Sequence, residues 1–241
     1  MKKSLTTLLA GAALALLALN ATAQEAAIRK ALADSIPQFA KIDEVRPTPM
    51  PGLYEVRVGT DLFYTDAKGQ YLIQGELMDT KARRNLTEER MTKLTAINFS
   101  ELPLKDAFTI VRGDGSRKLA VFEDPNCGYC KRFERDMQKV DNVTVDLFLY
   151  PILSPDSVER SRNIWCAKDR AAAWQDHMVR DKNNPPATCD ADVLQRNLAL
   201  GKKYRITGTP TLVFADGSRV PGAIPAQEVE KRLADAGSAA R

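Results

Sequence analysis

The chain has 241 residues, carries 35 Lys and Arg against 31 Asp and Glu for a formal charge of +4, and is 44% hydrophobic. No long run of like charge occurs, so neither a nucleic-acid-binding surface nor a polybasic membrane patch is expected. A chain of this length can form one large domain or two smaller ones, with a core that does not need a dense set of disulfides to hold it together.

The N-terminus has the layout of a secretory signal. Met1-Lys2-Lys3 is basic, Leu5–Leu19 is apolar, and Asn20-Ala21-Thr22-Ala23 ends in an A-x-A site, which predicts a signal peptide over residues 1–23 with cleavage after Ala23. The alternative is a membrane anchor, but this apolar run is about 15 residues long and a spanning helix needs about 20. The mature chain would begin near Gln24 and be exported, with 33 basic and 31 acidic residues left.

The first part of the mature chain predicts a helix followed by strands. Residues 26–36 place apolar side chains at helical spacing, and residues 53–59 and 61–66 alternate as half-buried strands do. A turn at 67–69 leads to a third strand over residues 71–77. Such a small antiparallel sheet has little of its own to pack against, so we expect it to use a partner surface.

Residues 85–99 predict an amphipathic helix, with Thr87 as its N-cap and Met91, Leu94 and Ile97 on its apolar face. It would serve either as a linker between two domains or as a surface helix of the second domain. Leu102-Pro103-Leu104 ends it.

The second part of the chain changes from strands alone to strands alternating with helices. This order predicts a thioredoxin-like fold with helices inserted in its middle. The expected elements are a strand at 117–124, a helix at 127–140, a strand at 143–152, a helical stretch at 156–182, a helix at 189–204, a hairpin at 209–222 turning at Asp216-Gly217, and a helix at 226–236.

Two cysteines follow the first of these strands in the sequence FEDPNCGYC. Asn126 is expected to cap a helix that begins at Cys127, whose thiol would then ionise at roughly pH 3.5 to 7.5 and act as the nucleophile. Cys130, one turn further on, would resolve the mixed disulfide. Gly128 would leave the approach to Cys127 open, and Tyr129 would add an apolar, hydrogen-bonding edge.

The other two cysteines, Cys166 and Cys189, bracket a polar insert. In an oxidising compartment they are expected to form a structural disulfide, worth roughly 3 kcal/mol in the chain-entropy model. A second redox pair is the alternative, although neither cysteine follows a strand and opens a helix. A structural zinc site would need closer ligand spacing than these cysteines and the single His177 provide, so no metal and no cofactor is expected. His177 lies in a polar helical stretch and is expected to be solvated.

Thr209-Pro210 precedes the predicted hairpin, where a thioredoxin-like fold places a cis proline facing the dithiol. Cis geometry at Pro210 would leave Thr209 free to offer backbone hydrogen bonds to an extended substrate segment. A trans bond is the alternative that the bare sequence leaves open.

Together, FEDPNCGYC, IWCAKD with ATCD, GTPTLVF with ADG and VPG, and the N-terminal IQGELMD resemble the DsbC/DsbG type of periplasmic protein-disulfide isomerase. CGYC with a second disulfide is similar to the DsbC branch, whereas the DsbG branch typically has CPYC without the extra pair. The resemblance implies an α+β protein: a cystatin-like N-terminal dimerisation domain (24–84), a linker helix (85–105) and a thioredoxin-like catalytic domain (106–241) with a helical insertion.

The resemblance also implies a function. The expected protein is a periplasmic homodimer that isomerises incorrect disulfides of misfolded exported proteins, binds them as a chaperone does, and is kept reduced by a DsbD-like membrane thiol reductant. Three alternatives stay open: a dithiol oxidase of the DsbA type, a DsbG-like reductase of sulfenylated cysteines, and a chaperone with an idle dithiol. Val121 stands where thioredoxin has a buried acid, so the proton of Cys130 would pass to Glu123 or to water.

Overall fold

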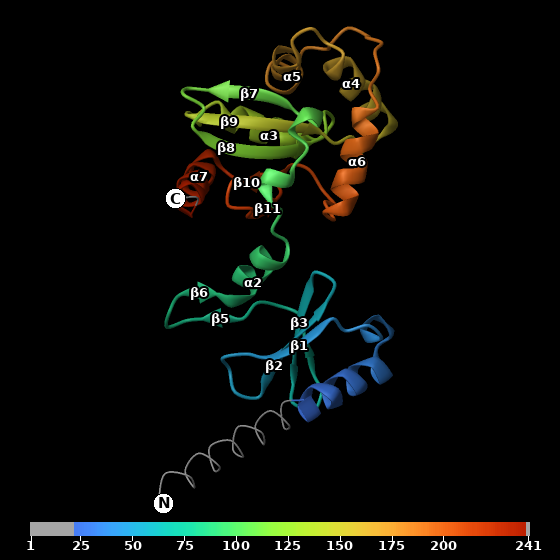
Figure 1. The fold of residues 1–241 in the computed structure, drawn as a ribbon, viewed down its shortest axis with the longest axis vertical. Coiled ribbons are helices and arrows are strands. Elements are labelled where there is room, and N and C mark those ends of the chain that lie inside the picture. The colour runs from blue at the N-terminus through green and yellow to red at the C-terminus, as the bar shows by residue number, and fades with distance from the viewer. Residues whose placement is uncertain (1–21, 240–241) are drawn as a thin grey trace, which may run out of the picture. The chain divides into compact units, whose positions relative to one another are not determined.

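The computed structural model describes residues 22–239 and divides the chain into two compact units, Met1–Leu94 and Thr95–Arg241 (Figure 1). Except for Thr22 and Ala23, the predicted signal peptide lies outside the described residues. The region predicted as a linker contributes residues 85–94 to the first unit and residues 95–105 to the second. Within the described part of the chain, no helix combines the length and the apolar character needed to span a membrane.

The first unit is an antiparallel sheet covered by a helix over residues 22–35. The helix packs Ile28 and Leu32 against Phe39, Val56 and Phe63. The strands lie in the order β1-β2-β3-β4, and a short hairpin, β5-β6, follows them. Their bounds are β1 (Glu44–Pro47), β2 (Leu53–Val58), β3 (Asp61–Asp66), β4 (Leu72–Ile73), β5 (Met78–Asp79) and β6 (Arg84–Asn85).

Two strand predictions for this unit were incomplete. β1 was not expected, because two of its four residues are Glu44 and Arg46, whose charges hide the strand pattern. The third expected strand, 71–77, is reduced to the two residues of β4, because pairing with β3 stops at Ile73.

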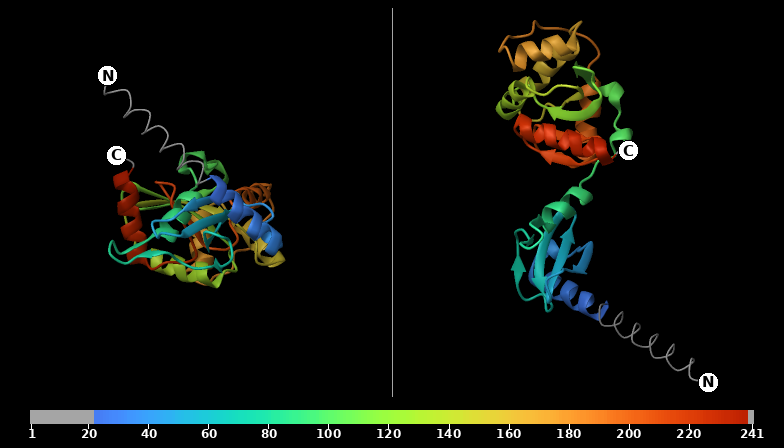
Figure 2. Two further views of the ribbon diagram at one scale, coloured as in Figure 1. Left: turned by 90° about the horizontal axis from the view of Figure 1, so that it is seen from below. Right: turned by 90° about the vertical axis from the view of Figure 1, so that its left-hand side faces the viewer.

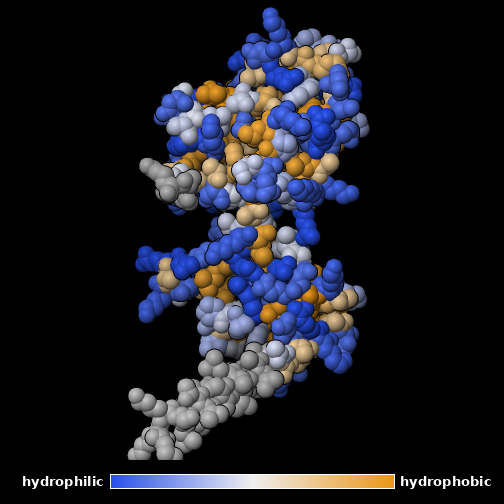
Figure 3. Space-filling model, viewed as in Figure 1, coloured by the Kyte–Doolittle hydropathy of each residue, from blue (hydrophilic) through white to orange (hydrophobic). Residues whose placement is uncertain are grey.

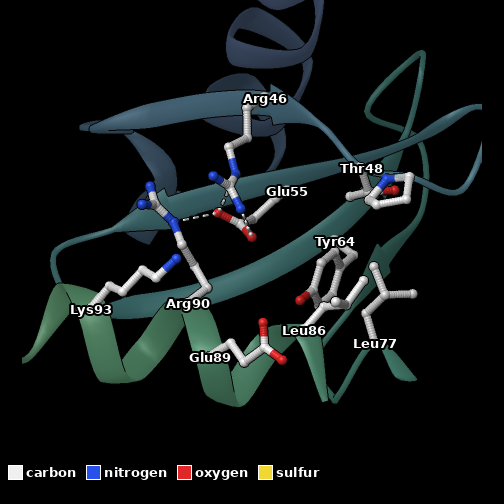
Figure 4. Close-up of a pocket in the computed structure, with 10 residues that line it drawn as sticks. Arg46, Thr48, Glu55, Tyr64, Leu77, Leu86, Glu89, Arg90 and Lys93 are labelled. Carbon is white, nitrogen blue, oxygen red and sulfur yellow. Dashed lines mark hydrogen bonds and ion pairs between the residues drawn. The ribbon is translucent and has the colours of Figure 1, made fainter. Parts of the chain in front are cut away.

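Ion pairs fasten helix α2 (Leu86–Leu94) to this sheet. Glu55 in β2 is almost fully buried, and its carboxylate lies 3.2 Å from Arg90 of α2 and 2.9 Å from Arg46 of β1. Figure 4 shows the two guanidinium groups beside Glu55 at the edge of a cavity of about 220 Å³. Because a buried carboxylate without a counter-ion is strongly destabilising, these pairs fix α2 in place.

The predicted N-cap of this helix was wrong. α2 begins at Leu86, and Asn85 Oδ1 accepts the N–H of Glu88 at 3.1 Å. Thr87 is buried instead; its hydroxyl accepts the Leu77 N–H at 2.8 Å and also hydrogen-bonds Tyr64. Both residue types are good caps, and tertiary contacts decide between them.

The second unit is built on a five-stranded mixed sheet in the order β11-β10-β8-β9-β7 (Figures 1 and 2). β8 and β9 are parallel and the other pairs are antiparallel. The strands are β7 (Phe108–Arg112), β8 (Arg117–Glu123), β9 (Val143–Leu149), β10 (Thr211–Phe214) and β11 (Arg219–Pro221). β7 was not predicted, and the expected hairpin turn lies between β10 and β11.

Alternation along β8 separates two apolar layers. Leu119 and Val121 face a core formed with helices α3 (Gly128–Met137), α5 (Arg170–Met178) and α7 (Ala226–Ala239). Ala120 and Phe122 face the opposite core, which also receives side chains of α6 (Val193–Lys203) and of the segment that precedes β7. On the face seen in Figure 3, hydrophobic and hydrophilic residues are interspersed in both units.

The predicted helical stretch 156–182 is two helices, α4 (Pro155–Trp165) and α5. The break follows from Asp169, whose carboxylate caps α5 by accepting the Ala172 N–H at 2.9 Å. Helix α6 begins at Val193, later than the expected Cys189, and Cys189 forms a disulfide with Cys166 just past the end of α4.

Candidate active site

Cys127 lies where β8 gives way to α3. It is itself the N-cap, with φ −78° and ψ 112°, and its Sγ accepts the Cys130 N–H at 3.1 Å. The prediction that Asn126 caps the helix was therefore wrong by one residue. The sulfur takes the place of the usual oxygen acceptor at a helix N-terminus, where unpaired N–H groups favour negative charge.

The turn before Cys127 is organised by Asp124. Its buried carboxylate accepts the N–H groups of Asn126 at 2.8 Å, Ile152 at 2.8 Å and Leu153 at 2.9 Å. Its carbonyl accepts the Cys127 N–H at 3.0 Å. The sequence analysis did not single out Asp124, although an Asp two residues before Asn126 in a Pro-Asn turn is the available signal.

The loop before β10 supplies the opposite side of the site. The Thr209–Pro210 bond is cis, as expected, and the Cys127 thiol, when protonated, donates to the Thr209 carbonyl at 3.3 Å. The rim beside Cys127 is open: a Cβ on Gly128 would meet no atom within 4 Å, and Tyr129 is 70% exposed. The fold thus brings together all six residues expected at the dithiol, which are Cys127, Gly128, Tyr129, Cys130, Thr209 and Pro210.

The pKa of Cys127 is lowered to about 6. The largest cause is its hydrogen bond with the Cys130 side chain, with smaller contributions from the Thr209 side chain and from the backbone N–H groups of Cys130 and Tyr129. Burial acts in the opposite direction but does not prevail. At neutral pH the sulfur is therefore mostly thiolate, the form that attacks a disulfide.

Unlike Cys127, both Cys130 and Glu123 have raised pKa values. Burial, the hydrogen bond to Cys127 and the charge of Glu123 raise the pKa of Cys130, so it stays a neutral thiol. Burial and the nearby Glu134 raise the pKa of Glu123 well above its usual 4.5. Since Leu119 and Val121 of β8 face α3, the alternation puts the Glu123 side chain on the Cys130 side of the sheet.

The two buried acids near Cys130 differ in their partners. Glu134 accepts hydrogen bonds from Trp174 and Gln175, each at 2.9 Å, and lies 3.7 Å from Arg112. Neither carboxyl oxygen of Glu123 has a hydrogen-bond partner within the part of the chain that the structure describes. A buried polar group without partners is rare and points to a functional role.

Residues of the helical insert form hydrogen bonds with the turn that precedes Cys127. The Asn126 amide donates to Asp156 at 2.8 Å and to the hydroxyls of Ser154 and Ser157, each at 3.2 Å. His177 was predicted to be solvated, but it is buried on α5 with Nε2 2.9 Å from the Pro125 carbonyl. The sequence could not reveal this contact, because the residues around His177 are polar and the two partners lie 52 positions apart.

The remaining cysteine chemistry is simple. Cys127 and Cys130 are free thiols, and Cys166 is joined to Cys189. Over residues 22–239, no three His, Cys, Asp or Glu side chains gather into a group that could hold a metal ion.

Comparisons with known proteins match both units of the chain. Residues 104–237 match a thioredoxin-like domain, and residues 19–88 match the disulfide bond isomerase protein N-terminal domain. The probable thiol:disulfide interchange protein DsbC of Bordetella parapertussis is 53% identical over 80% of this chain and 68% of that protein. The thiol:disulfide interchange protein DsbC of Escherichia coli K12 is 30% identical over 88% of this chain and 89% of that protein.

A solved structure also matches part of the chain. The disulfide interchange protein from Neisseria gonorrhoeae is 38% identical with a TM-score of 0.54, over 56% of this chain and 97% of that one.

Proposed function

Because the chain belongs to the DsbC family of thiol:disulfide interchange proteins, we propose that it is a periplasmic disulfide isomerase that reduces and reshuffles incorrect disulfides in exported proteins. The observation that carries this proposal is the pairing of a thiolate at Cys127, pKa about 6, with a neutral thiol at Cys130. A protein kept in this reduced state has the nucleophile that isomerisation needs.

The chemistry is thiol–disulfide exchange. The Cys127 thiolate attacks one sulfur of a substrate disulfide, forms a mixed disulfide and releases the other substrate sulfur as a thiolate. If that thiolate or another substrate cysteine attacks in turn, the substrate is reshuffled and Cys127 is regenerated with no net electron transfer. If Cys130 attacks Cys127 instead, the substrate leaves reduced by two electrons, and a DsbD-like membrane thiol reductant must restore the dithiol.

Glu123 is proposed as the proton acceptor for Cys130. The Cys130 thiol must lose its proton before it can attack, and its raised pKa makes this step difficult without a base. Glu123 lies on the same side of the sheet, is fully buried and is close enough to Cys130 for its charge to raise the pKa of that thiol. Its raised pKa brings it closer to that of the Cys130 thiol, so the ionised form of Glu123 is a stronger base than an ordinary carboxylate and can accept the proton.

Substrate would bind across the open rim of the site. Gly128 and Tyr129 border Cys127, and the cis bond at Pro210 presents Thr209 beside the sulfur. An extended segment could pair with this backbone by strand addition. Chaperone-like binding of misfolded chains is part of this proposal.

A homodimer is proposed through the β4 edge of the first unit. β4 is the last strand of its sheet, and the adjoining Tyr71 and its own Ile73 are 72% and 52% exposed. At the opposite edge, β1 carries Glu44 and Arg46, both in ion pairs. Natural edge strands are usually protected by charges, so an apolar, unpaired edge such as β4 suits pairing with a second copy.

Refolding of a scrambled multi-disulfide protein tests the isomerase directly. Wild type should restore the native disulfides, and Cys127→Ala should restore none above the uncatalysed rate. Cys130→Ala should retain reshuffling but accumulate mixed disulfides. If Cys127→Ala restored the native disulfides as well as wild type does, the protein would act only as a chaperone. If only the oxidised wild-type protein were active, it would be a DsbA-type oxidase.

The role of Glu123 predicts two effects of Glu123→Gln. Resolution of a mixed disulfide on Cys127 should slow by about tenfold or more, because the neutral amide cannot accept the Cys130 proton. The free energy of unfolding should be higher than that of wild type at pH 7. This difference should shrink as pH falls toward 4.5, where an unfolded Glu also holds its proton. An unchanged resolution rate would assign the proton to water.

The dimer is tested by Ile73→Lys, which places a charge on the β4 edge and should give monomers in light scattering. The monomer should lose isomerisation of scrambled substrate while it still reduces a small disulfide. Met50→Lys is the matched control, since Met50 is similarly exposed at 56% but lies in the turn between β1 and β2. A dimeric Ile73→Lys protein, or a monomer with full isomerase activity, would contradict this role for β4.

A further inference from the structure

We propose that His177 is a positioning residue for the nucleophile: its ring donates a hydrogen bond to the Pro125 carbonyl and thereby fixes the turn that places Cys127 at the start of α3. This inference rests on the proposed function of Cys127. It assigns a part in the chemistry to a residue of the helical insert that does not touch the reacting sulfur.

The direction of the hydrogen bond follows from its partners. Nε2 lies 2.9 Å from the Pro125 oxygen, and a carbonyl oxygen can only accept. The Lys182 backbone also hydrogen-bonds the ring, and Nε2 carries the proton whenever the ring donates to Pro125. Burial lowers the pKa of His177 and the charges of Lys131 and Arg160 lower it further, so the ring is neutral at neutral pH. The same N–H would donate in the protonated ring as well, so the contact does not depend on the charge of His177.

The carbonyl of Pro125 needs a hydrogen-bond donor from another part of the fold. It is buried, has no N–H of its own, and stands two residues before Cys127. A buried carbonyl left without a donor is destabilising, so without His177 the turn would be favoured to move the Pro125 carbonyl toward solvent. That movement would displace the residues on either side.

Each residue of the turn is held by a different element. Asp124 binds backbone N–H groups beyond β9, at Ile152 and Leu153. Pro125 is held by α5 through His177, and Asn126 by the start of α4. The hydrogen bond of 3.1 Å between the Cys130 N–H and Cys127 Sγ needs Cys127 in its N-cap conformation. A displacement of Pro125 would therefore also move Cys127, two residues later, and weaken the hydrogen bonds that stabilise its thiolate.

The test compares His177→Leu with His177→Gln in the full-length reduced protein. Leu fills a similar volume without a donor, whereas the Gln amide can replace the Nε2–H. The ring borders a cavity of about 180 Å³, which gives either side chain room to adjust. The readout is the pH dependence of Cys127 alkylation, which follows the thiolate fraction.

His177→Leu should raise the pKa of Cys127 and slow its alkylation at pH 6 by about fivefold, the change that a shift of about one pH unit from 6 produces. His177→Gln should stay within about twofold of wild type. Equal rates for wild type and the Leu variant would overturn the proposal. Equal slowing by Leu and Gln would also overturn it, because the ring would then act only by packing.

A measurement on the unmodified protein covers the case in which His177→Leu does not fold. The chain has one histidine, so its imidazole resonances need no assignment by mutation. The Nε2-bound proton should exchange slowly, and its chemical shift should show a titration step near pH 6 that is lost in Cys127→Ala, which separates it from the titration of His177 itself. A rapidly exchanging proton, or a shift indifferent to Cys127, would overturn the proposal. A Cys127 that forms no thiolate near this pH would instead overturn the proposed function.

Discussion

Hydrogen bonding from Cys130 to Cys127 Sγ is the interaction on which the rest of the site depends. The Cys130 side chain makes the largest contribution to the low pKa of Cys127, and the Cys130 N–H makes Cys127 the N-cap of α3, where the helix N-terminus stabilises a charge on sulfur. The sulfur is also largely buried, which alone would favour the neutral thiol. Hydrogen bonding prevails over burial, so the reduced dithiol holds one thiolate and one neutral thiol at neutral pH. The same asymmetry assigns attack to Cys127 and resolution to Cys130.

The two buried acids near the dithiol have different roles, one structural and one chemical. Glu134 is neutralised by Arg112 and hydrogen-bonded by Trp174 and Gln175, so it ties α3 to its neighbours. Glu123 is equally buried, and within the described residues its carboxyl oxygens have no comparable partners, which leaves it able to exchange a proton. Ion pairs in the first unit resemble the first case: Glu55 is buried only because Arg46 and Arg90 accompany it.

The sequence was informative wherever the chemistry lies in distinctive residue types or short motifs. The C-x-x-C pair after a strand, the Thr-Pro before a hairpin and the cysteines that bracket the insert all predicted contacts that the structure contains. It failed where a contact joins distant residues of ordinary type. His177 lies in a polar helix, and only the packing of α5 against the turn brings it to Pro125. Thr87 and Asn126 looked like caps by local pattern, but each is used by a tertiary hydrogen-bond network instead.

The most direct test of this account is titration of the Cys127 thiolate in the reduced protein by its ultraviolet absorbance, with Cys127→Ala as the blank. The account predicts one thiolate that appears with a midpoint near pH 6 and is absent from the variant, while Cys130 stays protonated throughout the neutral range. A midpoint near the free-cysteine value of about 8.5 would contradict it, because the start of α3 would then give Cys127 no advantage as a nucleophile.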